Sequence, residues 1–451
     1  MTSALPTKLE QLVDQQQYQK LVSDMLDMAK KEGAEEAEVS TNLQQGLGIS
    51  VRQQQVENLE FNRDKGIGIT VYIDKRKGTA STSDISHAAI KTAVKQAVAL
   101  AKVTERDDYA GLADPKDLAE YIPDLELYHP WEHDIAQAID IAKHCEKAAL
   151  DFDKRISNSD GASIHSQQGF RLYGNSNGFL AGYPSSRHSL SCVMIAKGKQ
   201  NMVRDYDYTV SRDASLLDTA LMIGESAAEK TVKRLDARKI RTSDMPVIFS
   251  PKISQSILGH FLSAISGSRL FRKTTFLLDS LNTPVFPKHI SLEENPHLLG
   301  ALGSSPFDGD GVQTRSKKLV ENGVVSSYIL SAYSARKLKM DNTGNAGGVR
   351  NVSVTTCDQN LEALCQEMGQ GLLVTELMGQ GVNLVTGDYS RGASGFWVED
   401  GKIQYPVHEI TIASNLKKMF QNIVKIGNDI DRRGNIFTGS IWVDKMMVAG
   451  S

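Results

Sequence analysis

The chain has 451 residues, of which 40% are hydrophobic and 23% charged, so it is long enough for two or three domains with a sizeable core. Its net charge of −3 excludes the overall positive field that nucleic-acid-binding proteins and proteins of anionic membrane surfaces use. No apolar run reaches the roughly 20 residues of a membrane span, and the polar N-terminus does not resemble a signal peptide. The cysteines form no CxxC pair, which is typical of reduced thiols. We therefore expect a cytoplasmic protein without a nucleic-acid or membrane partner.

Residues 1–235 have the pattern of an α/β region that contains helices and antiparallel strands. Apolar residues recur at helical spacing from Leu21 to Ala29. Residues 66–73 place branched apolar side chains on alternate positions, which predicts a strand with one apolar face. Ser83 or Asp84 is the expected N-cap of a second helix, whose apolar stripe runs to residue 101.

The same order of elements returns in the second part of this region. The pattern predicts a helix at residues 135–150, several short strands between residues 156 and 210, and a helix over residues 217–235. The repeated order of helix, strands and helix favours a duplication, with two related units at residues 1–125 and 126–235.

The remaining chain, residues 240–451, has the composition of a mostly β, glycine-rich domain. Residues 301–451 contain 19 glycines, whereas residues 1–150 contain 7. Hairpins are indicated at residues 319–325 and 397–403, and helices at residues 253–265 and 361–367. The predicted fold class is therefore α+β, with an N-terminal α/β region followed by a mostly β C-terminal domain.

Three short motifs resemble catalytic signatures but lack the structural context that the chemistry needs. Residues 129–133 spell H-x-x-E-H, a zinc signature, but Pro130 disfavours a helical conformation at His129. Residues 174–178 spell G-x-S-x-G, yet strand-like residues follow, which predicts a hairpin turn instead of a hydrolase elbow. His408-Glu409 lies in a strand-like alternation, with Ile412 where a second zinc histidine would stand.

Longer stretches resemble the PmbA (TldE) subunits of the TldD/PmbA metallopeptidase family. The residues that carry this resemblance cover nearly the whole chain: Val56 to Phe61, Gly66 to Tyr72, Phe271 to Ser280, Tyr333 to Leu338, Glu376 to Asn383, Gly387 to Glu399, Ile403 to Val407, Ile412 to Leu416 and Gly427 to Asp429.

The resemblance implies a two-protein peptidase. In this family the TldD-type subunit holds zinc through a His-Glu-x-x-x-His motif and a late cysteine, and the glutamate acts as general base. The PmbA/TldE subunit pairs with it around an enclosed cavity that admits unfolded peptides. The resemblance thus implies a metalloprotease heterodimer that degrades or processes peptides, with zinc in the partner and no cofactor in this chain.

The family motif is degenerate in this chain. When His260 is aligned with the second zinc histidine, the first ligand position falls on Gln255 and the general-base position on Ser256. Thr438 stands where the cysteine ligand is expected. Since a catalytic zinc site needs about three protein ligands, we predict no metal site and no catalytic residue here. We expect His260 to be a hydrogen-bonded residue at the edge of the core.

Tyr389, Arg391 and Gly392, within the glycine-rich signature, are the candidates for contact with substrate or partner. An extended peptide can add to an exposed strand edge through main-chain hydrogen bonds. Glycines at positions 379, 381, 387, 392 and 395 would allow close approach of such a peptide. The alternative is that these glycines only form turns of a β domain.

Two other functions remain open at this point. An autonomous zinc metallopeptidase would need an unrecognised set of ligands, with His408, Glu409 and His260 as its nucleus. A non-proteolytic regulator would act on DNA gyrase or on toxin–antitoxin proteins. The sequence also leaves open a homodimer of the isolated chain.

Overall fold

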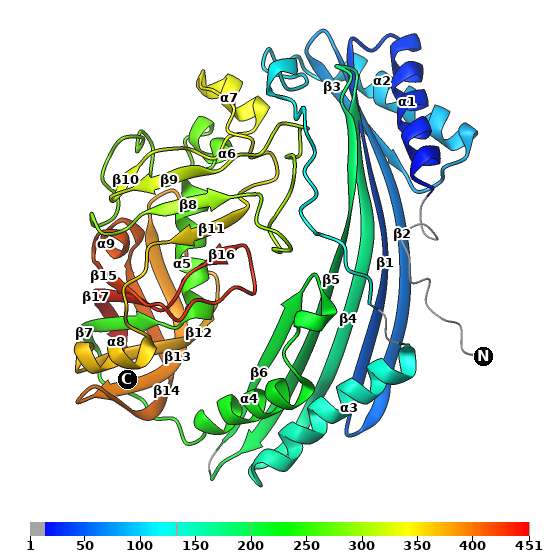
Figure 1. Ribbon diagram of the computed structural model, residues 1–451. Helices are drawn as coiled ribbons and strands as arrows, with labels where there is room; N and C mark the ends of the chain where they lie inside the picture. Colours follow the sequence, from blue (N-terminus) through cyan, green and yellow to red (C-terminus); the bar gives the residue numbers. More distant parts are fainter. Residues whose placement is uncertain (1–13, 132–133, 200, 451) are drawn as a thin grey trace.

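The computed structural model describes residues 14–131, 134–199 and 201–450. Two lobes are evident in Figure 1: a long curved sheet with its helices, from the first half of the chain, and a strand-rich lobe from the second half. Helices and antiparallel strands in the first lobe confirm the predicted α+β class, and so does the strand-rich second lobe.

The first lobe is built on one six-stranded sheet in the order β3-β2-β1-β4-β5-β6. All neighbouring strands in it are antiparallel. The central pair joins the two halves of the lobe, since Glu38 of β1 lies opposite Asn175 of β4. The strands are β1 (Glu36–Arg52), β2 (Gln55–Ile73), β3 (Arg76–Thr82), β4 (Ile156–Asn175), β5 (Leu180–Lys197) and β6 (Met202–Ser211).

Two helices cover each end of this sheet and give it two separate cores. Helices α1 (Gln15–Lys31) and α2 (His87–Val103) pack on one end, where Val22, Ile69 and Val94 are buried together. Helices α3 (Ile135–Phe152) and α4 (Ala220–Lys233) pack on the other end. The order of helix, three strands and helix therefore occurs twice, and one continuous sheet connects both sets. Short 3-10 turns lie at Pro115–Asp117 (η2) and Ala214–Leu216 (η3).

Two details of this lobe differ from the sequence-based expectation. The strands between residues 156 and 210 are long, because β4 and β5 extend across both helix-covered ends of the sheet. The second helix begins at His87 and is capped by Ser86, whose hydroxyl accepts from the amide of Ala89. Asp84 lies outside the helix, where its carboxylate accepts from the amide and hydroxyl of Ser86.

The second lobe contains two sheets around the largest core. One sheet has the order β14-β13-β12-β7-β17-β15, and β14 also pairs with β17, so five of these strands form a closed ring. The other sheet has the order β10-β9-β8-β11-β16. The strands are β7 (Ser243–Phe249), β8 (Leu292–Asn295), β9 (Lys317–Glu321), β10 (Val324–Val325), β11 (Asn351–Val354), β12 (Gly371–Met378), β13 (Asp388–Glu399), β14 (Lys402–Asn415), β15 (Ile423–Ile426), β16 (Ile436–Phe437) and β17 (Ile441–Ala449).

Helix α5 (Pro251–Ala264) lies at the centre of this lobe (Figure 1). Its helical stripe Ile257, Leu258, Phe261 and Leu262 is buried in the core. The predicted hairpins at β9–β10 and β13–β14 are present. The other helices are α6 (Gly267–Phe271), α7 (Ala332–Leu338), α8 (Leu361–Met368) and α9 (Leu416–Gln421). No helix among the described ranges has the length and apolar character to cross a bilayer.

Candidate functional site

The aligned positions of the degenerate zinc motif lie on the polar face of α5. Pro251 at the first turn suits a helix start, because its missing amide hydrogen would have no helical partner there. Gln255, Ser256 and His260 are all partly exposed, whereas the opposite face is buried. The same amphipathic pattern that buries one face of α5 in the core therefore leaves these three side chains on its other, partly exposed face.

Internal hydrogen bonds engage the first two positions. The Gln255 amide nitrogen lies 3.4 Å from the carbonyl oxygen of Asp431, to which it donates. The Ser256 hydroxyl donates to the carbonyl of Ile253, at 2.7 Å. Neither group combines with a neighbouring imidazole or thiol into a ligand set.

Thr438 is fully buried at the end of β16, close to the same loop. Its hydroxyl donates to the carbonyl of Gly439 at 3.1 Å, and its own carbonyl accepts from the amide of Asp431. Asp431 therefore connects Gln255 to Thr438. The structure brings these two sequence positions to one loop although 183 residues separate them.

His260 forms a second group with Tyr389 and Arg391 of β13. The His260 and Tyr389 rings meet edge to face, with centroids 6.1 Å apart. Burial, and secondarily the nearby Arg391, lowers the pKa of His260, so the neutral imidazole is favoured. Burial raises the pKa of Tyr389. His260, a position of the zinc motif, thus lies close to Tyr389 and Arg391, which were candidates for contact with substrate or partner.

Two polar atoms of this group, one of His260 and one of Tyr389, are buried without hydrogen-bond partners. In the described part of the chain, neither Nε2 of His260 nor the hydroxyl of Tyr389, whose side chain is 1% exposed, has a partner. His260 was expected to be a hydrogen-bonded residue at the edge of the core; its Nε2 makes no such bond in the described part of the chain, and its ring packs against Tyr389. Unsatisfied buried polar atoms cost about 1–3 kcal/mol each.

Two glycines of the signature are required by close contacts within the fold itself. A Cβ atom at Gly381 would lie 1.8 Å from the carbonyl oxygen of Ser390, and one at Gly395 would lie 1.8 Å from that of Leu373. Gly392 leaves more room, with Met378 Cβ at 3.4 Å. At Gly381 and Gly395, therefore, the neighbouring backbone leaves no room for a side chain.

The residues suggested for an independent metal site are His408, Glu409 and His260, and within the described part of the chain they do not come together as a set of ligands. Glu409 adopts a left-handed conformation (φ 53°) at an irregularity of β14, and its carboxylate pairs with Lys239 at 3.4 Å. Across the described ranges no three His, Cys, Asp or Glu side chains gather as metal ligands. An amide, two hydroxyls and one imidazole at the family positions do not fit a catalytic zinc.

The other rejected motifs have structural explanations where they are described. Residues 174–178 span the end of β4 and the turn that leads into β5, with Gly178 at φ 89°, so the G-x-S-x-G motif is part of a hairpin. His129 bonds the carbonyl of Glu126 through Nε2, at 3.0 Å. The rest of the H-x-x-E-H motif, Glu132 and His133, lies outside the described residues.

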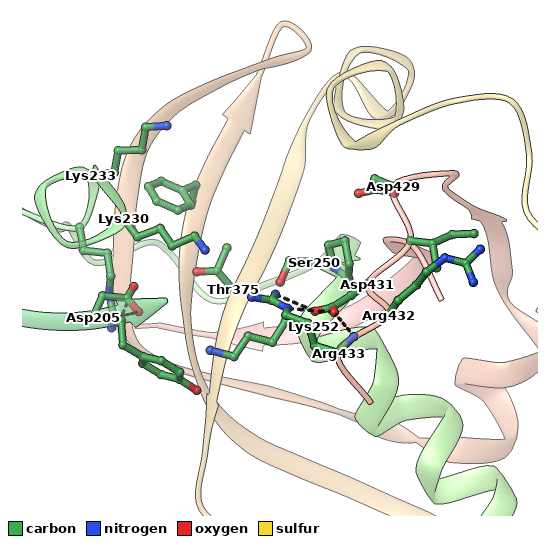
Figure 2. Close-up of a pocket in the computed structure, with 15 residues that line it drawn as sticks. Asp205, Lys230, Lys233, Ser250, Lys252, Thr375, Asp429, Asp431, Arg432 and Arg433 are labelled. Atoms are coloured by element: carbon green, nitrogen blue, oxygen red, sulfur yellow. Dashed lines mark hydrogen bonds and ion pairs between the residues drawn. The ribbon is translucent and has the colours of Figure 1, made fainter. Parts of the chain in front are cut away.

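A cavity between the two lobes was not foreseen from the sequence. It has a volume of about 490 Å³ and lies between α4, β6, the first turn of α5 and the loop at residues 429–433. In Figure 2, Lys230, Thr375 and Ser250 face the same space. Asp207 beside it pairs with Lys230 at 2.7 Å and with Arg433 at 2.9 Å. The sequence carried no signal for this cavity, because its walls come from six separate segments.

The fold and the degenerate site correspond to a class of metallopeptidase-like proteins. Family models described as the PmbA/TldA metallopeptidase domain 1, central domain and C-terminal domain match residues 37–101, 128–235 and 242–450. The chain belongs to the PmbA/TldA metallopeptidase family.

Individual relatives agree with this assignment over the full length. The chain is 49% identical over 438 residues to a metalloprotease PmbA homolog of Haemophilus influenzae, covering 97% of each chain. It is 47% identical over 451 residues to metalloprotease PmbA of Escherichia coli O157:H7, covering 99% of this chain and 100% of the relative.

Solved structures share the fold. A protein from Bacteroides thetaiotaomicron, named as a proposed modulator of DNA gyrase, has a TM-score of 0.92 at 28% identity, covering 98% of this chain and all of that one. TldE from Thermococcus kodakarensis has a TM-score of 0.80 at 21% identity, covering 95% of this chain and all of that one. At 21% identity the likeness to TldE concerns the fold alone.

Proposed function

We propose that this chain is the PmbA/TldE-type subunit of a cytoplasmic two-protein metallopeptidase, and that it works with a TldD-type subunit that carries the zinc. The complex degrades or processes unfolded peptides. This chain contributes a wall of the peptide chamber and binds no catalytic metal of its own.

The observation that carries the proposal is the chemistry of the polar face of α5. Gln255 and Ser256, which take the places of a ligand and a general base, are engaged in internal hydrogen bonds. Thr438, in place of the cysteine, is buried and bonded to Gly439. His260 alone retains a ligating type, and one imidazole is too few for a catalytic zinc.

The location of Arg391 supports a role for β13 in binding the partner or the peptide. Its guanidinium donates to the carbonyl of Met378 at 3.3 Å, at the point where β12 ends. Gly392, next along the strand, is partly exposed. Strand β7 pairs with β12 only at residues 372–374, so the main chain at the end of β12, beside Arg391, suits an extended peptide, whose recognition through backbone hydrogen bonds requires little sequence preference.

The test is reconstitution. The purified chain, a TldD-type subunit, and the mixture are each incubated with an unfolded peptide, and products are followed by mass spectrometry. We expect cleavage that requires the mixture, and elemental analysis of this chain alone should show far less than one zinc per molecule. Cleavage by this chain alone, or stoichiometric tightly bound zinc, would overturn the proposal.

Two alternatives rest on the names of relatives. The curated relatives are named metalloproteases, which favours an autonomous peptidase, and the Bacteroides structure is named for DNA gyrase. The first alternative predicts activity of the isolated chain in the same assay. The second predicts binding of gyrase subunits in the absence of a TldD-type protein, measured by calorimetry.

A further inference from the structure

The cavity of about 490 Å³ between the lobes is lined by polar groups that the chain leaves without partners. Its volume lies in the range of about 300–1,000 Å³ that is usual for small-molecule sites. Ser250, Lys252 and Thr375 line it, and within the described ranges none of their side chains makes a hydrogen bond or an ion pair. All three side chains can donate hydrogen bonds.

Ser250 is the N-cap of α5, but its hydroxyl does not cap the helix. An N-cap serine normally accepts from an amide of the first turn through its side chain. Here the amides of Ile253 and Ser254 donate to the Ser250 carbonyl, at 2.9 and 2.8 Å, and the hydroxyl makes no cap bond. The hydroxyl therefore remains available to a ligand in the cavity.

Thr375 reaches the cavity because β12 has a bulge at this position. The pairing of β12 with β13 passes from Val374 to Glu376 and leaves Thr375 out of the ladder. A bulge changes the direction of the side chain at the extra residue. In Figure 2 the Thr375 side chain lies beside the space that Ser250 and Lys230 also face.

Lys252 brings a positive charge that no carboxylate of the described ranges neutralises by an ion pair. Its ammonium lies 3.5 Å from the centroid of the Tyr206 ring, and this cation–π contact holds the side chain at the cavity wall. The side chain is partly exposed, so it can contact a ligand without leaving the ring.

The carboxylates of the cavity wall already have donors within the chain. Each accepts from a neighbouring side chain: Asp205 from Arg234, Asp429 from Ser440 and Asp431 from Arg433. Lys230 shares the carboxylate of Asp207 with Arg433, so one anion serves two cations there. The wall therefore has an excess of donors and of positive charge, and an anion is the complementary ligand.

The donors suit a phosphate better than a carboxylate. A phosphate monoester has three terminal oxygens and a charge of about −1.5 to −2 at neutral pH, whereas a carboxylate has two oxygens and one charge. Lys252, Lys230 and the two hydroxyls match the larger number. The ring of Phe396, which also lines the cavity, suits the organic group of an ester.

We propose that the cavity between the lobes binds a phosphate monoester, whose phosphate contacts Lys252, Ser250 and Thr375 and whose organic group lies against Phe396. These residues belong to the second lobe and Lys230 belongs to the first, so the bound phosphate also connects the lobes. None of them is a position of the degenerate zinc motif. The inference therefore goes beyond the proposed function and does not rest on it.

Three small probes test the class of ligand: phenyl phosphate, benzoate and inorganic phosphate. Calorimetric titration of the full chain should give a Kd of about 1 mM or lower for phenyl phosphate, and at least roughly fivefold higher values for the other two. Tighter binding of benzoate, equal binding of inorganic phosphate, or no binding of phenyl phosphate at about 10 mM overturns the proposal.

Substitutions test the location of the site. Lys252→Ala should weaken phenyl phosphate binding by roughly tenfold and Thr375→Val by roughly threefold, because each removes a donor to the phosphate. Lys417→Ala is the matched control, since Lys417 is exposed on α9 and does not line the cavity, and it should keep the wild-type Kd. Thermal melting confirms that each variant folds. An unchanged Kd in Lys252→Ala, or an equal loss in Lys417→Ala, contradicts the assignment.

Discussion

At the scale of single residues, Asp308 shows how burial perturbs a carboxylate between the lobes. The side chain is fully buried and accepts hydrogen bonds from the amides of Asp310, Val312 and Ala346, at 2.8–3.0 Å. Burial, and then the nearby Asp310, raises the pKa of Asp308 to about 6. The three amides favour the charged form but do not compensate for its loss of water.

This pKa predicts a stability that depends on pH. The folded pKa of about 6 lies above the usual value of 3.8, so the contribution of Asp308 is fully present below pH 3.8 and is lost as pH rises through 6. The expected loss is about 3 kcal/mol. In urea unfolding between pH 4 and 6, Asp308→Asn should flatten the pH profile. The exposed Asp341→Asn is the control, and an equal flattening in both variants would contradict the assignment.

At the scale of elements, β13 shows two kinds of glycine within four residues. Gly395 faces the backbone of β12 so closely that no side chain fits, whereas Gly392 faces a flexible Met378 side chain. Both glycines belong to the stretch by which the sequence resembles its family. Only Gly395 is explained by the pairing of β12 with β13.

The two glycines therefore predict different costs. Gly395→Ala should lower the free energy of unfolding by about 3 kcal/mol or more, because Cβ would lie 1.8 Å from the Leu373 carbonyl and the two strands must separate. Gly392→Ala should change it by less than about 1 kcal/mol. Urea denaturation monitored by circular dichroism measures both. Equal costs would show that the β12–β13 contact relaxes easily.

At the scale of the whole molecule, the side chains of Arg336 and Arg433 link the two lobes. Arg336 of α7 donates to the carbonyls of Tyr109, Gly111 and Leu112, at 2.7–2.8 Å. On the other side of the interface, Arg433 links Asp207 of β6 to Asp431. Arg433 and Asp431 also line the cavity of about 490 Å³ between the lobes.

Removal of Arg336 should loosen this interface. Arg336→Ala leaves three carbonyl groups without their donor, at an expected total cost of about 2–4 kcal/mol. Hydrogen exchange should rise in residues 104–118 while the core of the second lobe stays protected. Arg336→Lys keeps the positive charge but lacks the planar guanidinium that donates to three carbonyls at once. We therefore expect hydrogen exchange between that of the wild type and that of Arg336→Ala. Unchanged exchange in Arg336→Ala would show that other contacts hold the lobes.

Only part of the candidate site could be predicted from the sequence. The family pattern identified Gln255, Ser256, His260 and Thr438 one by one, because motif alignment needs only residue order. It did not show that Asp431 joins Gln255 to Thr438, or that His260 packs against Tyr389. Those contacts join helix α5 to a loop and a strand more than a hundred residues further along the chain, and residue spacing does not encode them.

Local patterns were sufficient to predict several helices of the first lobe, helices α5 and α8 and two hairpins of the second, because helical and strand periodicities are set by neighbours within a few residues. Tertiary structure alone decided the length of β4 and β5, which depends on both ends of the sheet being covered by helices. It also decided where a cavity forms between the lobes. These features are set by which distant segments exclude water from one another, and that is a property of the folded chain as a whole.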